Sequence, residues 1–187
     1  MPETGAESYF ELFGLPPSYA IDLARLGRVY RILQRNMHPD RFANSSDQER
    51  RLSMQQAARI NDAYQVLTDP LSRGRYLLEL HGYHFDAEHS TTRSVEFLTE
   101  QMELREALAE VRDHDDPAGK LVEIMGRISD RLKQSEGLLH DYLRLDETGR
   151  LTGPVESAVD TVLKMKYYRR LQEEVQDLED ELDNDLN

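Results

Sequence analysis

His38, Pro39 and Asp40 combine side-chain types that serve in acid–base catalysis and in metal binding. A catalytic His–Asp pair needs the carboxylate at one imidazole nitrogen and a reacting group at the other. Pro39 fixes its own φ and biases His38 away from helical geometry, so the two side chains should diverge from a tight, extended turn. The sequence also contains no glycine-rich phosphate loop and no nucleophile elbow. The tripeptide is therefore a poor candidate for a catalytic pair.

A second candidate site consists of three histidines, His81, His84 and His89. Their H-x2-H-x4-H spacing falls in a polar segment where no carboxylate or thiolate pattern completes a known ligand set. The sequence has no cysteine, which excludes disulfides, thiolate metal sites and cysteine nucleophiles. We expect no metal site, no cofactor and no catalytic residue. An alternative functional class is a metal-dependent or hydrolytic enzyme that uses these histidines.

The elements that would position these residues have a helical pattern almost throughout, and no stretch shows the alternation typical of strands. The predicted fold class is therefore all-α. An acidic stretch after Arg170 has eight acidic and no basic residues, and should be a solvated helix face that frays toward its end. We predict helices at residues 9–13, 22–36, 47–69, 71–80, 94–112, 117–145 and 154–182, with a turn at 37–46.

The helix predicted at residues 22–36 should present two different faces. Its apolar residues point nearly opposite to its arginines on a helical wheel. The apolar set is Leu26, Val29, Tyr30, Leu33 and Met37, and the basic set is Arg25, Arg28, Arg31 and Arg35. The next helix should pack on the apolar face through Leu52, Ala57, Ile60, Ala63, Tyr64 and Leu67. The arginines then form a basic outer stripe with few acidic residues available for i,i+4 pairing.

Charge is divided unevenly along the sequence, whose formal net charge is −13. Residues 1–78 hold ten arginines and no lysine against nine acidic residues, whereas residues 79–187 hold 13 basic and 27 acidic residues. This break indicates two units with different surfaces. Apolar runs are too short to span a membrane, and no secretory or mitochondrial leader is visible before Arg25. We therefore expect a cytoplasmic protein that binds neither nucleic acid nor membrane.

The three helices predicted in the second half should form an antiparallel bundle, because short loops connect them. The first of them has a core face made of Phe97, Leu104, Leu108 and Val111. Leu98 and Met102, with Val95 beside them, point roughly 130° away from that face, close to Glu103, Glu106 and Glu110. The last helix has a heptad-like seam at Tyr168, Leu171, Val175, Leu178 and Leu182. An apolar strip flanked by acidic residues is thus predicted outside the core.

About the first 70 to 80 residues resemble a J-domain, the module that docks on DnaK-like chaperone ATPases. YFELFGLP at residues 9–16, the arginine-bearing helix, the His38-Pro39-Asp40 tripeptide and RINDAYQVLTDPLSRGRY at residues 59–76 carry the resemblance. It implies that the basic helix meets an acidic chaperone surface and that the tripeptide triggers ATP hydrolysis in the chaperone. The chaperone-binding residues would be Arg25, Arg28, Arg31, Arg35, His38, Pro39, Asp40 and Arg41.

Nearly the full length resembles the HscB family, the J-type co-chaperones of iron–sulfur cluster assembly. The wider resemblance is carried by YLLELHGY at residues 76–83, FLTEQMELREALAE at 97–110 and AVDTVLKMKYYRRL at 158–171. It implies an HscA-type chaperone and an IscU-type scaffold as partners, and a protein that stimulates its partner's ATPase without being an enzyme itself. The implied domains are a J-domain at residues 8–80, a linker at 81–93 and a scaffold-binding three-helix bundle at 94–183.

The resemblance also assigns the scaffold contacts, which would be Leu98, Met102, Glu103, Glu106, Glu110 and Tyr167. Thr99 departs from the family pattern, because relatives can have methionine there, and this implies a smaller apolar patch. The alternative is a J-domain co-chaperone for a different client protein. A general client binder would need a broader apolar surface than this strip provides.

Overall fold

The computed structural model describes residues 7–42, 45–85, 92 and 94–185, and of Pro39, Asp40 and Asp185 it describes the backbone alone. Across these residues the chain is helical, and strand-like pairing is limited to one isolated bridge between Leu145 and Leu151. The predicted all-α fold class is confirmed. No helix in these ranges is long and apolar enough to cross a membrane.

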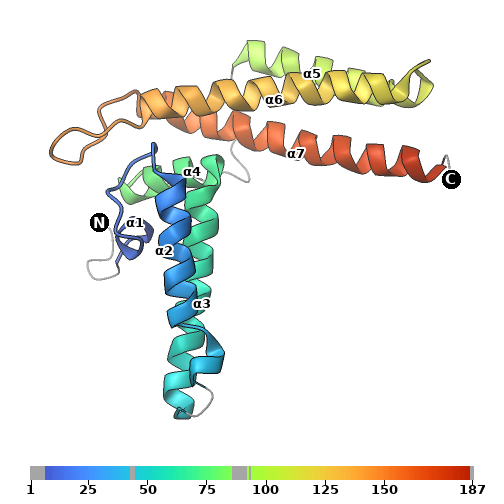
Figure 1. Ribbon diagram of the computed structural model, residues 1–187. Coiled ribbons are helices and arrows are strands. Elements are labelled where there is room, and N and C mark those ends of the chain that lie inside the picture. The colour runs from blue at the N-terminus through green and yellow to red at the C-terminus, as the bar shows by residue number, and fades with distance from the viewer. Residues whose placement is uncertain (1–6, 43–44, 86–91, 93, 186–187) are drawn as a thin grey trace. The chain divides into compact units, whose positions relative to one another are not determined.

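The chain divides into two compact units (Figure 1). The first unit contains the chain up to Tyr83 together with the loop Leu143–Gly153. The second unit contains His84–Tyr142 and the chain from Pro154 onward. The loop between the last two helices therefore belongs to the first unit, although the sequence alone places it in the helical bundle.

Four helices build the first unit: α1 at Tyr9–Leu12, α2 at Leu23–Asn36, α3 at Asp47–Thr68 and α4 at Pro70–Leu80. Local sequence sets their limits, because side chains satisfy the free amide groups at each helix start. Ser8 and Ser46 form capping boxes with the glutamates three residues later, and Asp22 caps α2. Between α3 and α4, the Asp69 carboxylate accepts the Ser72 amide at 2.8 Å and Pro70 opens the new helix.

Helices α2 and α3 form an antiparallel hairpin whose inner faces carry the core of this unit (Figure 1). The rings of Tyr30 and Tyr64 stack with their centroids 3.9 Å apart, and the Tyr30 hydroxyl donates to Asn61 Oδ1 at 3.0 Å. Fully buried side chains from α1, α2, α3 and α4 complete this core, among them Phe10, Leu26, Ile60, Leu67, Leu77 and Leu78.

The prediction that Leu52 of α3 lies in the core is wrong. Leu52 is 52% exposed, and its neighbour Ser53 is buried in its place. Ser53 lies seven residues before Ile60 and therefore on the same helical face, whereas Leu52 is turned about 100° away. The Ser53 hydroxyl can be buried without penalty because it donates to the Arg50 carbonyl at 2.9 Å within the helix.

The second unit consists of α5 at Val95–Ala109, α6 at Pro117–Tyr142 and α7 at Val155–Asp185, and a short 3₁₀ helix, Val111–Asp113, follows α5. Helix α6 packs closely along α7, and α5 lies beside the pair, running in the same direction as α7 (Figure 1). Their buried residues form one core, which includes Phe97, Leu104, Ile124, Ile128, Met165, Tyr168 and Leu171.

Two details of this unit differ from the prediction. Leu108, which was expected in the core, is only half-buried, because α5 ends at Ala109 and the chain tightens into the 3₁₀ helix. Helix α7 continues to Asp185 beyond its predicted end. Leu178 and Leu182 are half-buried on its inner side, so the acidic stretch is the outer face of a packed helix for most of its length.

Candidate functional site

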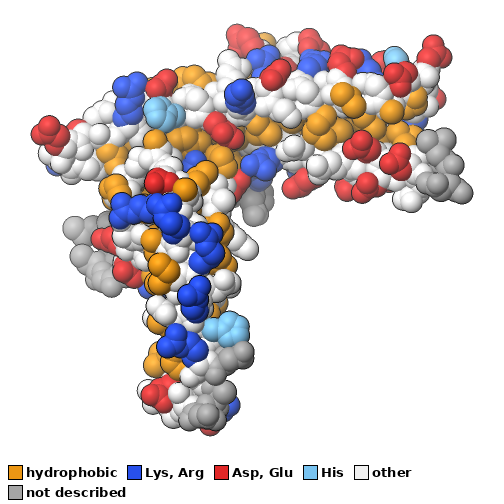
Figure 2. Space-filling model, in the orientation of Figure 1, with side chains coloured by type: hydrophobic (Ala, Val, Ile, Leu, Met, Phe, Trp, Pro, Cys, Tyr) orange, Lys and Arg blue, Asp and Glu red, His pale blue; other side chains and the backbone are white. Residues whose placement is uncertain are grey.

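The arginines of α2 form an exposed basic stripe, as the helical wheel predicts. Arg25, Arg28, Arg31 and Arg35 are all exposed, and so is Arg41 beyond the helix. Within the described ranges none of the five has a carboxylate close enough for an ion pair. Arg25 donates a hydrogen bond from Nη2 to the Gly14 carbonyl of its own unit at 2.7 Å. Figure 2 shows basic side chains following one another along α2.

His38 lies directly after α2, at the end of this stripe, and its side chain is exposed. The next four residues, Pro39–Phe42, form a 3₁₀ helix whose turn is closed by a 3.0 Å bond from the Arg41 amide to the His38 carbonyl. The predicted turn is therefore partly helical and tighter than an extended segment. The side chains of Pro39 and Asp40 lie outside the described residues.

Among the described residues, the other histidines form no cluster that could hold a metal ion. His81 uses both ring nitrogens within the first unit: Nδ1 lies 2.7 Å from the Leu77 carbonyl and Nε2 lies 3.0 Å from the Gly149 carbonyl. His84 is exposed, and His89 lies outside the described residues. In the part of the chain that the structure describes, no three histidine, aspartate or glutamate side chains are grouped closely enough to hold a metal ion.

The apolar strip of α5 opens onto a groove between α5 and α7, which we call the α5–α7 groove. Leu98 is 45% and Met102 64% exposed, because Phe97 and Leu104 anchor the opposite face of α5 in the core. The start of α5 is fixed by Ser94, whose hydroxyl accepts the Phe97 amide at 3.3 Å. The groove has a volume of about 530 Å³ and is lined by Leu98, Gln101, Met102, Arg105, Glu106 and Tyr167.

Tyr167 of α7 forms the wall of this groove. Its ring is half-buried and packs edge to face against Phe97 and Tyr168, with centroids 5.5 and 5.9 Å away. Its hydroxyl donates to the Gln101 carbonyl of α5 at 3.3 Å. Burial raises the pKa of Tyr167, so the hydroxyl stays protonated and available as a donor. The ring thus presents one edge to the groove and is supported by core aromatics behind it.

Arg105 is a groove residue that was not predicted from the sequence. Its guanidinium binds the Glu174 carboxylate with two hydrogen bonds of 3.0 and 3.1 Å, and lies 5.9 Å from the centre of the Tyr167 ring. The hydrogen bonds to Glu174 raise the pKa of Arg105. A signal was available, because Arg105 follows Leu98 by seven residues and so occupies the same helical face.

The acidic residues expected to flank the apolar strip separate in the structure. Glu106 lines the α5–α7 groove. Glu103 lies on the other side of α5, where its Oε2 is 3.6 Å from Nη2 of Arg127 on α6. Glu110 is exposed at the end of α5 and lines neither groove. Of the predicted scaffold contacts, the structure therefore brings together Leu98, Met102, Glu106 and Tyr167.

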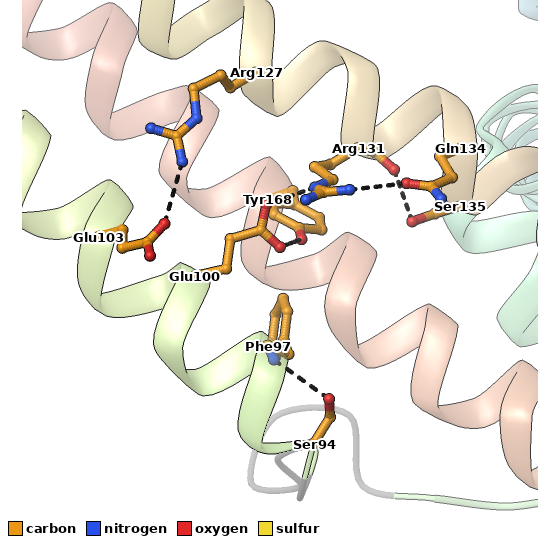
Figure 3. A network of polar contacts seen from close by, with 9 residues as sticks. All are labelled: Ser94, Phe97, Glu100, Glu103, Arg127, Arg131, Gln134, Ser135 and Tyr168. Carbon is orange, nitrogen blue, oxygen red and sulfur yellow. Dashed lines mark hydrogen bonds and ion pairs between the residues drawn. The ribbon is translucent and has the colours of Figure 1, made fainter.

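Glu103 faces a second groove, the α5–α6 groove, which a polar network occupies (Figure 3). Arg131 of α6 donates from Nε to Glu100 Oε1 at 2.5 Å, and the Tyr168 hydroxyl of α7 donates to Glu100 Oε2 at 2.9 Å. Arg131 also donates to Gln134 at 3.1 Å. Glu100 therefore ties all three helices together at this level, and its charge is already compensated within the unit.

Both surfaces have features that suit protein–protein binding. The α2 stripe offers exposed guanidinium groups, which suit long-range steering and bidentate pairing with carboxylates. The α5–α7 groove offers exposed apolar side chains beside a supported aromatic ring and an acidic rim residue. This is the arrangement found at the centres of protein–protein interfaces.

Comparison with known proteins supports one family for the whole chain. Residues 93–176 match the family described as the HSCB C-terminal oligomerisation domain. A protein named Co-chaperone protein HscB homolog from Shewanella pealeana is 41% identical over 175 residues, covering 94% of this chain and 98% of the relative. Among solved structures, chaperone HscB from Vibrio cholerae superimposes with a TM-score of 0.78 at 38% identity, over 94% of this chain and 99% of that one. Human co-chaperone protein HscB gives 0.80 at 31% identity, over 94% and 83% of the two chains. The chain therefore belongs to the HscB family of J-type co-chaperones.

Proposed function

We propose that this co-chaperone binds an IscU-type iron–sulfur scaffold through the α5–α7 groove and delivers it to an HscA-type, DnaK-like chaperone. It stimulates the ATPase of that chaperone and hydrolyses no ATP itself. In this proposal residues 8–80 dock on the chaperone, residues 81–93 are the linker, and residues 94–183 bind the scaffold. The site of action is the cytoplasm.

The observation that carries scaffold binding is the exposure of Leu98 and Met102 beside the Tyr167 ring. Apolar side chains that a helical bundle leaves exposed around a supported aromatic residue can serve as a small binding hot spot. Glu106 at the rim, with the excess of acidic residues in the second unit, favours a partner segment that carries basic residues. Glu103 and Glu110 act at longer range in this proposal, by attracting the same basic partner.

Chaperone docking is supported by the α2 stripe. Arginines that find no carboxylate within the described part of their own chain are available to one on a partner. His38 is exposed at the end of the stripe, so a partner that binds the arginines also meets His38-Pro39-Asp40. The scaffold site and the docking stripe lie on one chain. A scaffold bound at the groove is therefore present at a raised local concentration near a chaperone bound at the stripe.

The proposal is tested with three purified proteins: this chain, an IscU-type scaffold and an HscA-type chaperone. Calorimetry should detect binding of the scaffold, and the chaperone's ATP turnover should rise when this chain is added. The chain alone should show no ATP turnover. Stimulation of the chaperone without scaffold binding would indicate a different client protein. Absence of both effects would remove the proposal.

A further inference from the structure

We propose that Arg105 and Glu174 form a positioning pair that holds Tyr167 in place as the wall of the α5–α7 groove. The inference rests on the proposed binding of a scaffold in that groove. In this inference the two residues prepare the binding surface and do not contact the scaffold themselves.

The first argument is the geometry around Tyr167. The hydrogen bond from the Tyr167 hydroxyl to the Gln101 carbonyl is 3.3 Å long, which is beyond the usual range for a hydroxyl donor. The ring is half-buried, so core packing supports it on one side only. Arg105 lines the same groove, and its guanidinium carbon lies 5.9 Å from the centre of the Tyr167 ring. The cation therefore adds a restraint on the ring beside its core contacts.

The second argument is that Arg105 is itself held in place. Two parallel hydrogen bonds of 3.0 and 3.1 Å fix the plane of its guanidinium against the Glu174 carboxylate. Glu174 also lies 4.0 Å from Nε of Arg170, one turn earlier on α7. Arg105 is therefore not a loose surface side chain, and its position follows that of α7.

The third argument concerns charge. A basic residue in the groove would repel the basic partner segment that the acidic rim favours. Pairing with Glu174 compensates the charge of Arg105, so the groove keeps its apolar character and its acidic rim. A guanidinium engaged in this way can pack on an aromatic ring without disturbing recognition.

The repeated spacing between α5 and α7 provides a matched control. Arg105 and Glu174 are 69 residues apart, and the ion pair between Arg112 and Glu181 spans the same 69 residues. Arg112 lies in the 3₁₀ helix after α5, seven residues beyond Arg105, and Glu181 lies seven residues beyond Glu174 on α7. The pair Arg112–Glu181 does not line the groove. Its loss should therefore remove an ion pair of the same kind without affecting Tyr167.

The test measures the dissociation constant of an IscU-type scaffold by calorimetry, with the melting temperature recorded for each variant. In Arg105→Met the Tyr167 side chain is no longer held in advance, so binding must immobilise it. This cost should weaken binding by roughly three- to tenfold. Arg112→Met should bind like the wild type. Glu174→Gln breaks the same pair from α7 and should weaken binding to a similar degree, so the result does not depend on one variant folding well.

A double-mutant cycle separates positioning from a merely structural effect. If Arg105 acts through Tyr167, then Arg105→Met should change the dissociation constant by less than about twofold in a Tyr167→Ala background. Undiminished weakening in that background would overturn the inference. So would wild-type binding by Glu174→Gln together with weak binding by Arg105→Met, because Arg105 would then contact the scaffold directly.

The outcomes also distinguish this inference from the proposed function. If Leu98→Ala weakens scaffold binding and Arg105→Met does not, the groove is the binding site and the positioning role is wrong. If the wild-type protein fails to bind the scaffold, the proposed function and the inference fall together.

Discussion

The hydroxyl of Tyr168 on α7 donates a 2.9 Å hydrogen bond to the Glu100 carboxylate on α5, whose other oxygen accepts Arg131 from α6 (Figure 3). One carboxylate thus links three helices at the edge of the core. Burial and the bond to Glu100 raise the pKa of Tyr168 above its ordinary value. The contact has consequences for stability that depend on pH.

We expect Tyr168→Phe to lower the free energy of unfolding by about 1–2 kcal/mol at neutral pH, because Glu100 loses a hydrogen bond. The folded state binds the Tyr168 proton more tightly than the unfolded state does. The resulting stabilisation is complete below about pH 10, the ordinary tyrosine pKa, and is lost as pH rises above it. Denaturant unfolding from pH 7 to pH 11 should show a shallower alkaline decline in the variant. The exposed Tyr83, changed to Phe, is the control and should alter neither quantity.

The second prediction concerns His38. His38→Gln should abolish stimulation of the chaperone's ATPase and leave scaffold affinity and melting temperature unchanged, because the side chain is exposed and remote in sequence from the groove. Steady-state ATP turnover and scaffold calorimetry provide the two readouts. A variant that stimulates at the original rate would contradict the assigned role of the tripeptide.

The third prediction concerns the α2 stripe. Arg31→Glu should weaken chaperone docking, and the wild-type affinity should fall as salt rises, since exposed charges are screened over about 8 Å at physiological ionic strength. The variant should show a smaller salt dependence because it has fewer favourable charges to screen. Lys133→Glu, on the exposed side of α6, changes the net charge equally and should have little effect. Affinity that is indifferent to salt would exclude steering by this helix.

The fourth prediction concerns the groove. Leu98→Ala and Met102→Ala should each cost roughly 1–2 kcal/mol of scaffold binding. Neither change should alter the melting temperature much, because both side chains are largely exposed. Val122, which is 69% exposed on α6 and does not line the groove, provides the matched control as Val122→Ala. Equal losses at Val122 and Leu98 would show that the groove has no special role.

Tyr167 and Leu171 complete the contrast between surface and core. Tyr167→Ala should weaken scaffold binding and also lower stability, because the ring packs on Phe97 and Tyr168. Leu171 is fully buried, and its replacement by Ala should cost about 2–5 kcal/mol of unfolding free energy. The folded fraction of Leu171→Ala should still bind the scaffold, which calorimetry below its melting transition can verify.

Much of this architecture could be predicted from the sequence, because helical spacing fixes the direction in which each side chain leaves its own helix. The exposure of Leu98 and Met102 and the outward arginines of α2 follow from that spacing alone. Which residue a side chain contacts depends on the position of the neighbouring helix, and a helical wheel contains no information about that position. Glu103 shows this limit: the wheel places it about 140° from Leu98, and only the folded structure shows that it meets Arg127 of α6 there.

The residues missed by sequence reasoning have the same explanation. Arg105 occupies the face of Leu98, but its role in the site depends on Glu174, which lies 69 residues later. Leu52 is a different case, because the helical phase set by Ile60 favours Ser53, and the prediction followed the apolar character of Leu52 instead. Long-range pairing between elements is the information that periodicity in one segment lacks.

The ion pair between Arg105 and Glu174 also limits the length of the apolar part of the α5–α7 groove. Seven residues separate Leu98 from Arg105, and at 1.5 Å per residue this is a distance of about 10 Å along α5. An extended peptide covers such a distance with roughly three residues, and a helix with about two turns. In the proposed complex this polar boundary favours a short insertion from the partner, and a longer apolar segment would have to displace a charged pair to bind.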